Sequence, residues 1–207
     1  MLQNQFKNMN ALIKRIFDIS LSSLGLLFLS PLFLIISIVI KITMLDGPIL
    51  FKQIRIGRYG KKFTLIKFRS MYVSNEKSKI SVLEDKTRIS SFGSFLRKYK
   101  LDEFPELWNV LIGDMSFVGP RPDVPGYADK LEGEDKKILL LRPGITGPAS
   151  IKYANEEKML SNVDDPKNYN DEIVYPDKVK INIEYYENNT LYTDLIIIFK
   201  TVFRINY

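Results

Sequence analysis

The longest apolar stretch of the chain lies near its N-terminus. Residues 19–40 run through 22 positions without a charge, and about 20 apolar residues are enough to cross the hydrocarbon core of a bilayer. A buried helix of this length would be unusual in a water-soluble domain. The stretch also exceeds the apolar region of a cleavable signal peptide, and no small-residue cleavage site follows it. The pattern predicts a membrane-bound protein.

Ser30 and Pro31 divide this stretch into two arms. Proline removes one backbone donor and clashes with the carbonyl four residues earlier, here that of Leu27, so the helix must bend or break. A neighbouring serine can bond a nearby carbonyl in place of water. The arms, 19–30 and 32–40, have 12 and 9 residues. At ~1.5 Å per residue each reaches about half of a ~30 Å core, which fits a re-entrant helix-break-helix hairpin that enters and leaves by one leaflet.

Basic residues flank both ends of the apolar stretch: Lys7, Lys14 and Arg15 before it, and Lys41, Lys52 and Arg55 after it. A spanning helix usually carries its basic excess on one side, so these flanks favour the hairpin. A kinked helix that spans once is the alternative, since prolines are tolerated in spanning helices. We divide the chain into a membrane hairpin with its flank, 1–45, and a domain on the membrane surface, 46–207.

Two alternating runs between residues 48 and 68 enclose Gly57, Arg58, Tyr59 and Gly60. Alternation around a turn of this composition predicts a β-hairpin. We expect the polar face of this hairpin to form a basic stripe.

The remaining elements complete an α+β fold. We expect helices after 91–93, from 104–105 to 113 and over 128–141, with 175–189 alternating or helical. Loops are expected over 74–88, with at most a short helix, and at the proline- and glycine-rich segments 119–127 and 142–148, while 154–174 is acidic and polar. The last run, 191–203, is too short to span a membrane. It is either an amphipathic helix at the membrane interface or an ordinary core helix.

The composition of the chain limits which side chains can act in catalysis. The chain has no cysteine and no histidine, which excludes a catalytic imidazole, a thiolate nucleophile and a disulfide framework. Residues 1–100 carry 18 Lys and Arg against 5 Asp and Glu, whereas 101–207 carry 12 against 19. Seven basic residues and no acidic one lie between 47 and 75. This segment should face an anion: nucleic acid, lipid head groups or a phosphorylated substrate.

Asp102 and Glu103 are candidates for chemistry, because they stand at the start of a predicted helix. Both side chains can lie near the positive end of the helix dipole, where free N–H groups also favour phosphate. A carboxylate can attack phosphorus to give an acyl phosphate, and it can hold magnesium. The alternative is a capping or solvated pair.

Two arginines stand in rigid loops. Arg121 lies between Pro120 and Pro122, and Arg142 precedes a proline-glycine loop that contains Thr146. An arginine on a fixed backbone loses little entropy on binding, and its planar fork matches a phosphate. The alternative is a turn whose arginine faces water.

The order of motifs resembles the bacterial sugar transferases that are monotopic phosphoglycosyl transferases. The resemblance is carried by KRIFD, the Ser30-Pro31 stretch, GPILFKQIRIG, FTLIKFRSM, LRKYKLDEFPELWNVLIGDMSFVGPRP, LRPGITG and DLIIIFKTV. It covers nearly the whole chain from about Lys14, and the segment 101–122 is the most specific part. The length matches the small members that lack additional N-terminal membrane helices.

This resemblance implies transfer of a sugar 1-phosphate from a UDP-sugar to polyprenyl phosphate, usually undecaprenyl phosphate, with release of UMP. It assigns Asp102 as the nucleophile of a covalent phosphosugar intermediate, Glu103 as its partner in metal or proton handling, and magnesium as the cofactor, held by these two residues. It associates the loop from Pro120 to Pro122 with the nucleotide. The enzyme would start cell-surface glycan assembly at the cytoplasmic face of a bacterial inner membrane, with several amphipathic helices at the interface.

Cations would offset the charge that repels a carboxylate from a diphosphate. The expected substrate-binding residues are Lys67, Arg69, Arg97, Pro120, Arg121, Pro122, Arg142 and Thr146. Glu106 departs from the family pattern, in which many members have glutamine, and so does the segment after residue 147, where we expect sugar selection to differ. The donor sugar stays open.

Partners follow from the same resemblance: a UDP-sugar, polyprenyl phosphate and membrane lipid, without nucleic acid. A second copy of the chain and downstream glycosyltransferases are the expected protein partners.

Two other functions are alternatives to the transferase. One is a membrane-tethered basic module that binds anionic lipid or nucleic acid through residues 52–69, and the other is an inactive scaffold in a glycan-assembly complex. The acidic second half opposes nucleic acid, and the Asp102-Glu103 pair opposes a scaffold.

Overall fold

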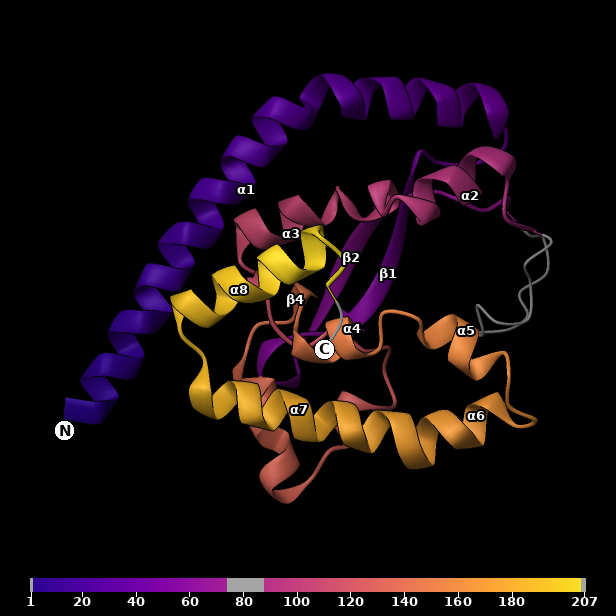
Figure 1. Ribbon diagram of the computed structural model, residues 1–207. Helices are drawn as coiled ribbons and strands as arrows, with labels where there is room; N and C mark the ends of the chain where they lie inside the picture. The colour runs from indigo at the N-terminus through magenta and orange to yellow at the C-terminus, as the bar shows by residue number, and fades with distance from the viewer. Residues whose placement is uncertain (1, 74–87, 206–207) are drawn as a thin grey trace.

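The computed structural model describes residues 2–73 and 88–205. The helices are α1 (Leu2–Thr43), α2 (Ser91–Lys98), α3 (Glu106–Ile112), α4 (Pro148–Lys152), α5 (Glu156–Leu160), α6 (Pro166–Tyr169), α7 (Tyr175–Asn188) and α8 (Leu191–Val202). The strands are β1 (Leu50–Ile56), β2 (Lys62–Phe68), β3 (Ser116–Val118) and β4 (Gly144–Thr146). Figure 1 shows α1 along one side of an α+β domain, with α7 on the opposite side. The loop expected over 74–88 lies outside the described residues, apart from its last position.

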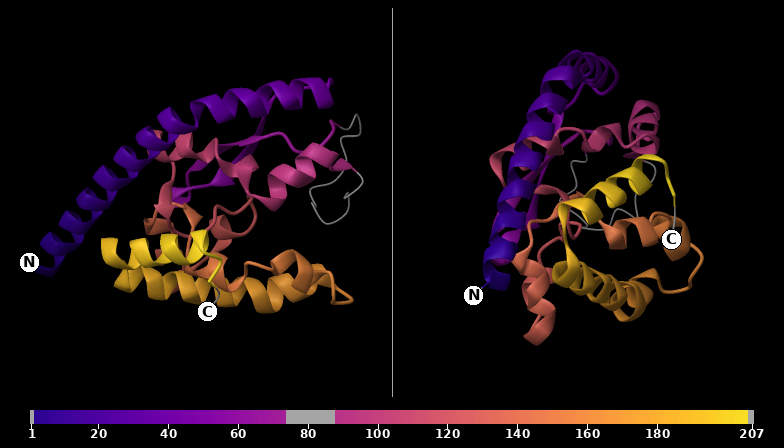
Figure 2. Two further views of the ribbon diagram at one scale, coloured as in Figure 1. Left: turned by 45° about the horizontal axis from the view of Figure 1, so that its top comes forward. Right: turned by 60° about the vertical axis from the view of Figure 1, so that its left-hand side comes forward.

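Helix α1 is bent and not broken. It is helical through all 42 residues, with Pro31 inside it, and Figures 1 and 2 show two arms that meet at a bend. The hydroxyl of Ser30 donates to the carbonyl of Leu27 at 2.7 Å, and so partners the group that proline deprives of its usual donor. The expected break at Ser30 and Pro31 is therefore corrected to a bend. Among the described residues, only this helix is long and apolar enough to cross a membrane, over Met9–Thr43.

Both flanks of the apolar stretch in α1 contact the rest of the chain. Near the start, the Lys14 ammonium donates to the carbonyl of Val118 at 2.9 Å, and the Asp18 carboxylate accepts from the backbone N–H of Phe117 at 3.1 Å. At the far end, a buried apolar cluster joins α1 to β2 and α2: Ile36, Ile40, Met44, Phe68 and Leu96. The side of α1 that faces away remains apolar and exposed, as at Leu27, Phe28 and Leu34. The helix is thus fixed to one body on both sides of its apolar stretch.

Strands β1 and β2 form the predicted antiparallel hairpin, with Leu50 opposite Phe68 and Ile56 opposite Lys62. The turn contains a short 3₁₀ segment, Arg58–Gly60, in which Tyr59 has a positive φ of 60°. The expectation of one basic face is wrong. Cross-strand partners share a face, and the register places Arg55 and Lys67 on the face of Phe63 and Leu65, and Lys52 and Lys62 on the other. The basic residues occupy both odd and even positions, which a period of two assigns to opposite faces.

Helix α3 packs on β2 through Asn109, whose buried amide donates to the carbonyl of Thr64 at 2.8 Å and accepts from the N–H of Ile66 at 3.1 Å. The predicted helices at 91–98 and 104–113 are confirmed. The second ends at Gly113, where φ is 98°, a left-handed conformation that suits glycine. A 3₁₀ turn, Leu101–Glu103, joins the two helices. This turn carries the candidate pair Asp102 and Glu103.

The rigid loop expected at 142–148 contains a strand. Strand β4 pairs in parallel with β3, with Val118 opposite Thr146, and the loop segment 119–127 between β3 and the next helix has no regular element, as expected. At Gly119 an added Cβ would stand 2.3 Å from the carbonyl oxygen of Arg142. Glycine allows this close approach of two backbones. Strands of three residues are too short to show a period in the sequence.

Apart from β4, the regular elements after residue 127 are helical. Residues 128–141 form 3₁₀ segments, Ala128–Lys130 and Gly133–Leu140, and not an α-helix. The acidic stretch 154–174 contains α5, α6 and a π-helical turn, Asn170–Val174. Helix α8 buries Ile197 in a core cluster with Val118, Ile151 and Tyr185, while Leu195, Phe199 and Val202 on the same helix are exposed. One face of α8 is therefore core, and its place relative to a membrane stays a prediction.

Candidate active site

The site lies where the turn Leu101–Glu103 meets the end of β2 and the loop that follows β3. Asp102 is buried, and its Oδ1 atom has no hydrogen-bond partner among the described residues. A buried carboxylate oxygen without a partner carries a desolvation penalty. Burial, together with the negative charge of Glu103, raises the pKa of the Asp102 carboxyl, and the charges of Lys67, Lys100 and Arg97 oppose this rise.

Glu103 is held between two cations. Its Oε1 atom accepts from Lys67 Nζ at 2.9 Å and from Arg121 Nη2 at 2.7 Å. Burial alone would favour the neutral acid, but Arg121 and Lys67 outweigh it and hold the pKa of Glu103 well below its usual range. Glu103 is thus a fixed, ionised carboxylate beside a carboxyl that is harder to ionise.

Lys67 has a second carboxylate partner, Glu106, whose Oε1 atom lies 3.1 Å from the ammonium. Burial raises the pKa of Glu106, and the charge of Lys67 opposes the rise. The result is a chain of alternating charges, Arg121, Glu103, Lys67 and Glu106, along one edge of the site. Glu106 was singled out in the sequence only as a departure from the family pattern. Its position three residues after Glu103, close to the candidate pair, is the signal that could have identified its role.

The loop of Arg121 is anchored by groups that sequence analysis missed. Arg55 Nη1 donates to the carbonyl of Pro122 at 2.9 Å, and the backbone N–H of Ile56 donates to the carbonyl of Asp123 at 2.9 Å. Tyr175 donates from its hydroxyl to the Asp123 carboxylate at 3.2 Å. Burial raises the pKa of Asp123 to about 6. These contacts fix the backbone that presents Arg121.

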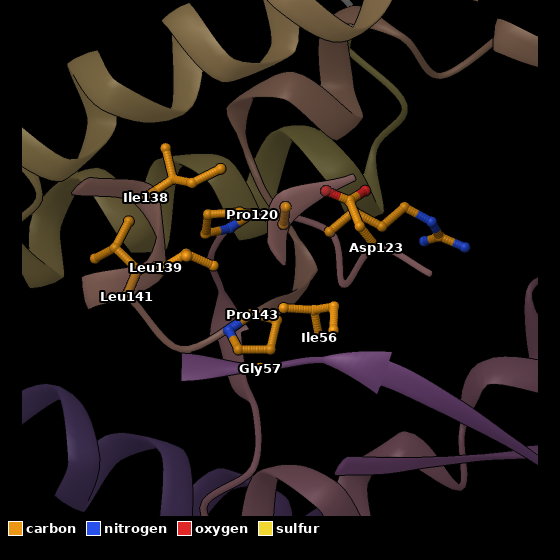
Figure 3. A pocket seen from close by; sticks show the side chains of 10 residues that line it. Ile56, Gly57, Pro120, Asp123, Ile138, Leu139, Leu141 and Pro143 are labelled. Carbon is orange, nitrogen blue, oxygen red and sulfur yellow. The ribbon is translucent and has the colours of Figure 1, made fainter. Parts of the chain in front are cut away.

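The two proline-containing loops line one hollow, and they pack against each other there. Figure 3 shows Pro120 and Pro143 at this hollow with Ile56 from the end of β1 and the Asp123 carboxylate. Its volume is about 20 Å³, which is room for roughly one water molecule. The hollow is too small for a nucleotide, whereas the side chain of Arg121 beside it is 47% exposed.

The structure brings together Lys67, Asp102, Glu103 and Arg121, with the charge of Arg97 nearby. Arg97 itself pairs with Glu157 at 3.0 Å. Three other predicted residues are engaged elsewhere. Arg69 is buried and donates to the carbonyls of Met44 and Asp46 after α1, Arg142 donates to the carbonyl of Gly113 at 2.9 Å, and Thr146 shares a hydrogen bond with Thr201 at 2.7 Å.

The residues present fit a magnesium ion that is shared with a substrate. Within residues 2–73 and 88–205, no group of three or more acidic side chains forms a protein cage for a metal. Magnesium, however, is usually bound through one or two carboxylates together with substrate phosphates and water. The carboxylate of Asp102, which is left without a hydrogen bond at Oδ1, would supply one such ligand, and the adjacent carboxylate of Glu103 would supply a second.

Comparison with known proteins gives a family match over most of the chain. The sequence model described as bacterial sugar transferase matches residues 9–206. The chain is 34% identical over 209 residues to the UDP-glucose:undecaprenyl-phosphate glucose-1-phosphate transferase of Klebsiella pneumoniae, in an alignment that covers 99% of this chain and 42% of that protein. The resemblance inferred from the motifs is confirmed by these matches.

Two further relatives differ in length. The chain is 32% identical over 196 residues to the UDP-N-acetylgalactosamine-undecaprenyl-phosphate N-acetylgalactosaminephosphotransferase of Aeromonas hydrophila, with 93% of this chain and 43% of the relative covered. It is 33% identical over 191 residues to the uncharacterized sugar transferase EpsL of Bacillus subtilis (strain 168), with 92% and 86% covered. The chain therefore spans about two fifths of the first two relatives and most of the third.

Proposed function

Because the chain belongs to the bacterial sugar transferase family, we propose that it moves a sugar 1-phosphate from a UDP-sugar to undecaprenyl phosphate and releases UMP. The named relatives support this substrate class, since their names pair a UDP-sugar or its sugar phosphate with undecaprenyl phosphate. These names differ in the sugar, so the donor sugar has to be found by assay. The reaction would be the first membrane step in assembling a cell-surface glycan.

The observation that carries the mechanism is the buried, unpartnered Oδ1 atom of Asp102 among cations. This carboxylate oxygen attacks the phosphorus that bears the sugar. The bond from that phosphorus to the oxygen of the uridine-bearing phosphate breaks, and UMP leaves with the electron pair. A phosphate oxygen of undecaprenyl phosphate then attacks the same phosphorus, which frees the Asp102 carboxylate and forms the diphosphate-linked lipid sugar.

The charges around this oxygen are set by three residues: Glu103, Lys67 and Arg121. Glu103 stays ionised and holds both cations in place. Arg121 uses one N–H group for Glu103, and its half-exposed guanidinium has further donors for a phosphate of the UDP-sugar. Magnesium, held by Asp102 and Glu103 with the substrate phosphates, would neutralise charge on the diphosphate.

The contacts of α1 support a hairpin in one leaflet. Residues near each end, Lys14 and Met44, contact the body that carries Asp102, so both ends of the apolar stretch are on the side of the site. We place this side at the cytoplasmic face of the bacterial inner membrane. A water-soluble nucleotide sugar and a lipid phosphate at head-group height can meet there. A second copy of the chain and downstream glycosyltransferases remain the proposed protein partners.

The test is UMP release from the purified full chain in detergent, supplied with magnesium, undecaprenyl phosphate and a panel of UDP-sugars. We expect turnover with at least one donor, loss of turnover with a chelator, and no turnover in Asp102→Asn. Asp135→Asn, which changes an exposed aspartate in the 3₁₀ segment Gly133–Leu140, is the matched control and should keep full activity.

Donor alone should leave a sugar-phosphate adduct on Asp102, detected by mass spectrometry of the intact chain and of its peptides. Turnover that requires both substrates at once, with no modified protein at any time, would contradict the covalent mechanism. Absence of UMP release with every donor would favour the non-catalytic lipid-binding alternative.

A further inference from the structure

Lys100 has a backbone conformation that disfavours its own side chain. Its φ and ψ are 57° and 22°, in the left-handed region, which residues with a Cβ adopt at a cost and glycine adopts freely. Among the described residues, only Tyr59 and Arg204 share a positive φ without being glycine. Because glycine would adopt this conformation without the cost, a lysine at this position suggests a role for its side chain.

The conformation itself serves the site. The N–H of Lys100 donates to the carbonyl of Arg97 at 3.2 Å, and its carbonyl accepts from the N–H of Glu103 at 3.3 Å. The residue therefore ends α2 and begins the 3₁₀ turn that carries Asp102. Glycine would make the same turn with less strain, so the backbone requirement does not explain the lysine.

Lys100 starts the turn that carries the two central carboxyl groups, and its charge lowers the pKa of both Asp102 and Glu103. The other cations of the site are already paired: Lys67 with Glu103 and Glu106, Arg121 with Glu103, and Arg97 with Glu157. Lys100 is exposed, and within the described part of the chain its ammonium makes no hydrogen bond or ion pair. Like the remaining donors of Arg121, it can therefore accept an incoming anion without giving up a partner.

We propose that the Lys100 ammonium is a phosphate-binding group of the Asp102 site. This inference rests on the proposed transferase function and adds a binding residue to it. The phosphate can come from two sources, the diphosphate of the soluble donor or the phosphate of the lipid acceptor. Both present the same anionic oxygens to the ammonium.

Three variants separate charge from backbone: Lys100→Gly relieves the strain and removes the charge, Lys100→Ala keeps the strain and removes the charge, and Lys100→Arg keeps both. A charge-assisted hydrogen bond is worth about 10- to 100-fold in binding or rate. We expect the glycine and alanine variants to lose about that factor in UMP release at low substrate concentration, and arginine to restore most of it. The glycine variant should melt no lower than the wild type.

The source of the phosphate is identified by two half-reactions. A loss in the rate of adduct formation with UDP-sugar alone assigns Lys100 to the donor diphosphate. Normal adduct formation with slow transfer to undecaprenyl phosphate assigns it to the acceptor. Either result supports a phosphate-binding role, and wild-type rates in both half-reactions of Lys100→Gly would overturn it.

Controls distinguish a failure of the Lys100 proposal from a failure of the proposed transferase function. If the wild type shows no turnover, the transferase proposal itself fails. If the wild type turns over and Lys100→Gly turns over at the same rate, only the role of Lys100 is contradicted. An equal loss in Lys98→Ala, an exposed cation two residues away, would assign the effect to general surface charge and overturn the proposal. Failure of arginine to rescue, or a lower melting temperature for Lys100→Gly, would likewise overturn it by showing a structural role.

Discussion

The guanidinium of Arg121 donates to the carboxylate of Glu103, with 2.7 Å between Nη2 and Oε1. This contact connects the loop after β3 to the turn that carries Asp102. Glu103 is nearly buried, whereas the Arg121 side chain is 47% exposed. One end of the arginine is therefore fixed by the protein, and the remaining donors are open to a ligand.

Replacement of Arg121 should reduce catalysis more than stability. In Arg121→Ala, Glu103 loses one of two cations and a substrate phosphate loses a donor, so we expect kcat/KM for UMP release to fall about 100-fold. Arg121→Lys should lose less, because the charge stays while the planar fork is lost. The ion pair is partly exposed, so the free energy of unfolding should change by only about 1 kcal/mol. Wild-type kcat/KM in the alanine variant would contradict the role.

Asp102→Asn should raise the melting temperature while it abolishes turnover. Because the folded state raises the pKa of Asp102, the ionised carboxylate at neutral pH destabilises the fold relative to the unfolded chain. Removing the charge should add about 1 kcal/mol, or roughly 2–4 °C. The single tryptophan, Trp108, reports unfolding by fluorescence, and Asp135→Asn should leave the melting temperature unchanged. A lower melting temperature for Asp102→Asn would contradict the burial argument.

The rate of adduct formation should depend on pH through Asp102. The ionised form is the nucleophile, and its raised pKa means that the rate falls on the acid side with a midpoint above the usual 3.8. Single-turnover measurements with donor alone keep the titration of the acceptor phosphate out of the profile. Lys100→Gly should move the midpoint to higher pH, since the charge of Lys100 lowers the Asp102 pKa. A rate that is constant down to the usual aspartate pKa would argue against this nucleophile.

Local patterns predicted the elements that form the frame of the site. Alternation around residues 57–60 predicted the hairpin, and proline and glycine at residues 105 and 113 marked the limits of α3. The parallel pairing of β3 with β4 could not be predicted, because three-residue strands show no period. The two faces of the hairpin could have been predicted, since Lys52 and Arg55 on the same strand differ in parity and so point to opposite sides.

The site was predictable only in part, because the side chains that contact one another in it are far apart in the sequence. The pair Asp102 and Glu103 was identified from its motif. Lys67 reaches Glu103 across 36 positions, a pairing that depends on the packing of α3 on β2. Arg142 has the same local setting as Arg121, yet it binds the carbonyl of Gly113. A rigid loop fixes the position of an arginine, but tertiary packing decides what the arginine meets.

Asp123 should make stability depend on pH between about 4 and about 6. Burial raises its pKa in the folded state to about 6, against 3.8 as the ordinary value. The unfolded chain therefore ionises first as pH rises, and the fold loses about 3 kcal/mol across this window. Asp123→Asn should remove this part of the loss, measured as the difference between the melting curves of variant and wild type from pH 4 to pH 7. Parallel pH profiles would contradict the raised pKa.

The N-terminal part of α1 and the body that holds its other end should be reached from the same side of the membrane. Lys14 contacts Val118 at one end of the helix, and Met44 packs with Phe68 and Leu96 at the other, so one body holds both ends. The chain has no cysteine, and single cysteines can therefore be placed at exposed positions 10 and 188 as Asn10→Cys and Asn188→Cys.

A membrane-impermeant maleimide should label both cysteines in inside-out vesicles and neither in right-side-out vesicles. Leu27→Cys, at an exposed apolar position beside the bend, is the matched control and should resist the reagent from both sides, because lipid covers it in a hairpin of one leaflet. Labelling of Asn10→Cys only from the side opposite to Asn188→Cys would require α1 to span the bilayer. The contacts of Lys14 with β3 would then have to break in the membrane, which would leave its ammonium without the Val118 carbonyl that accepts from it at 2.9 Å.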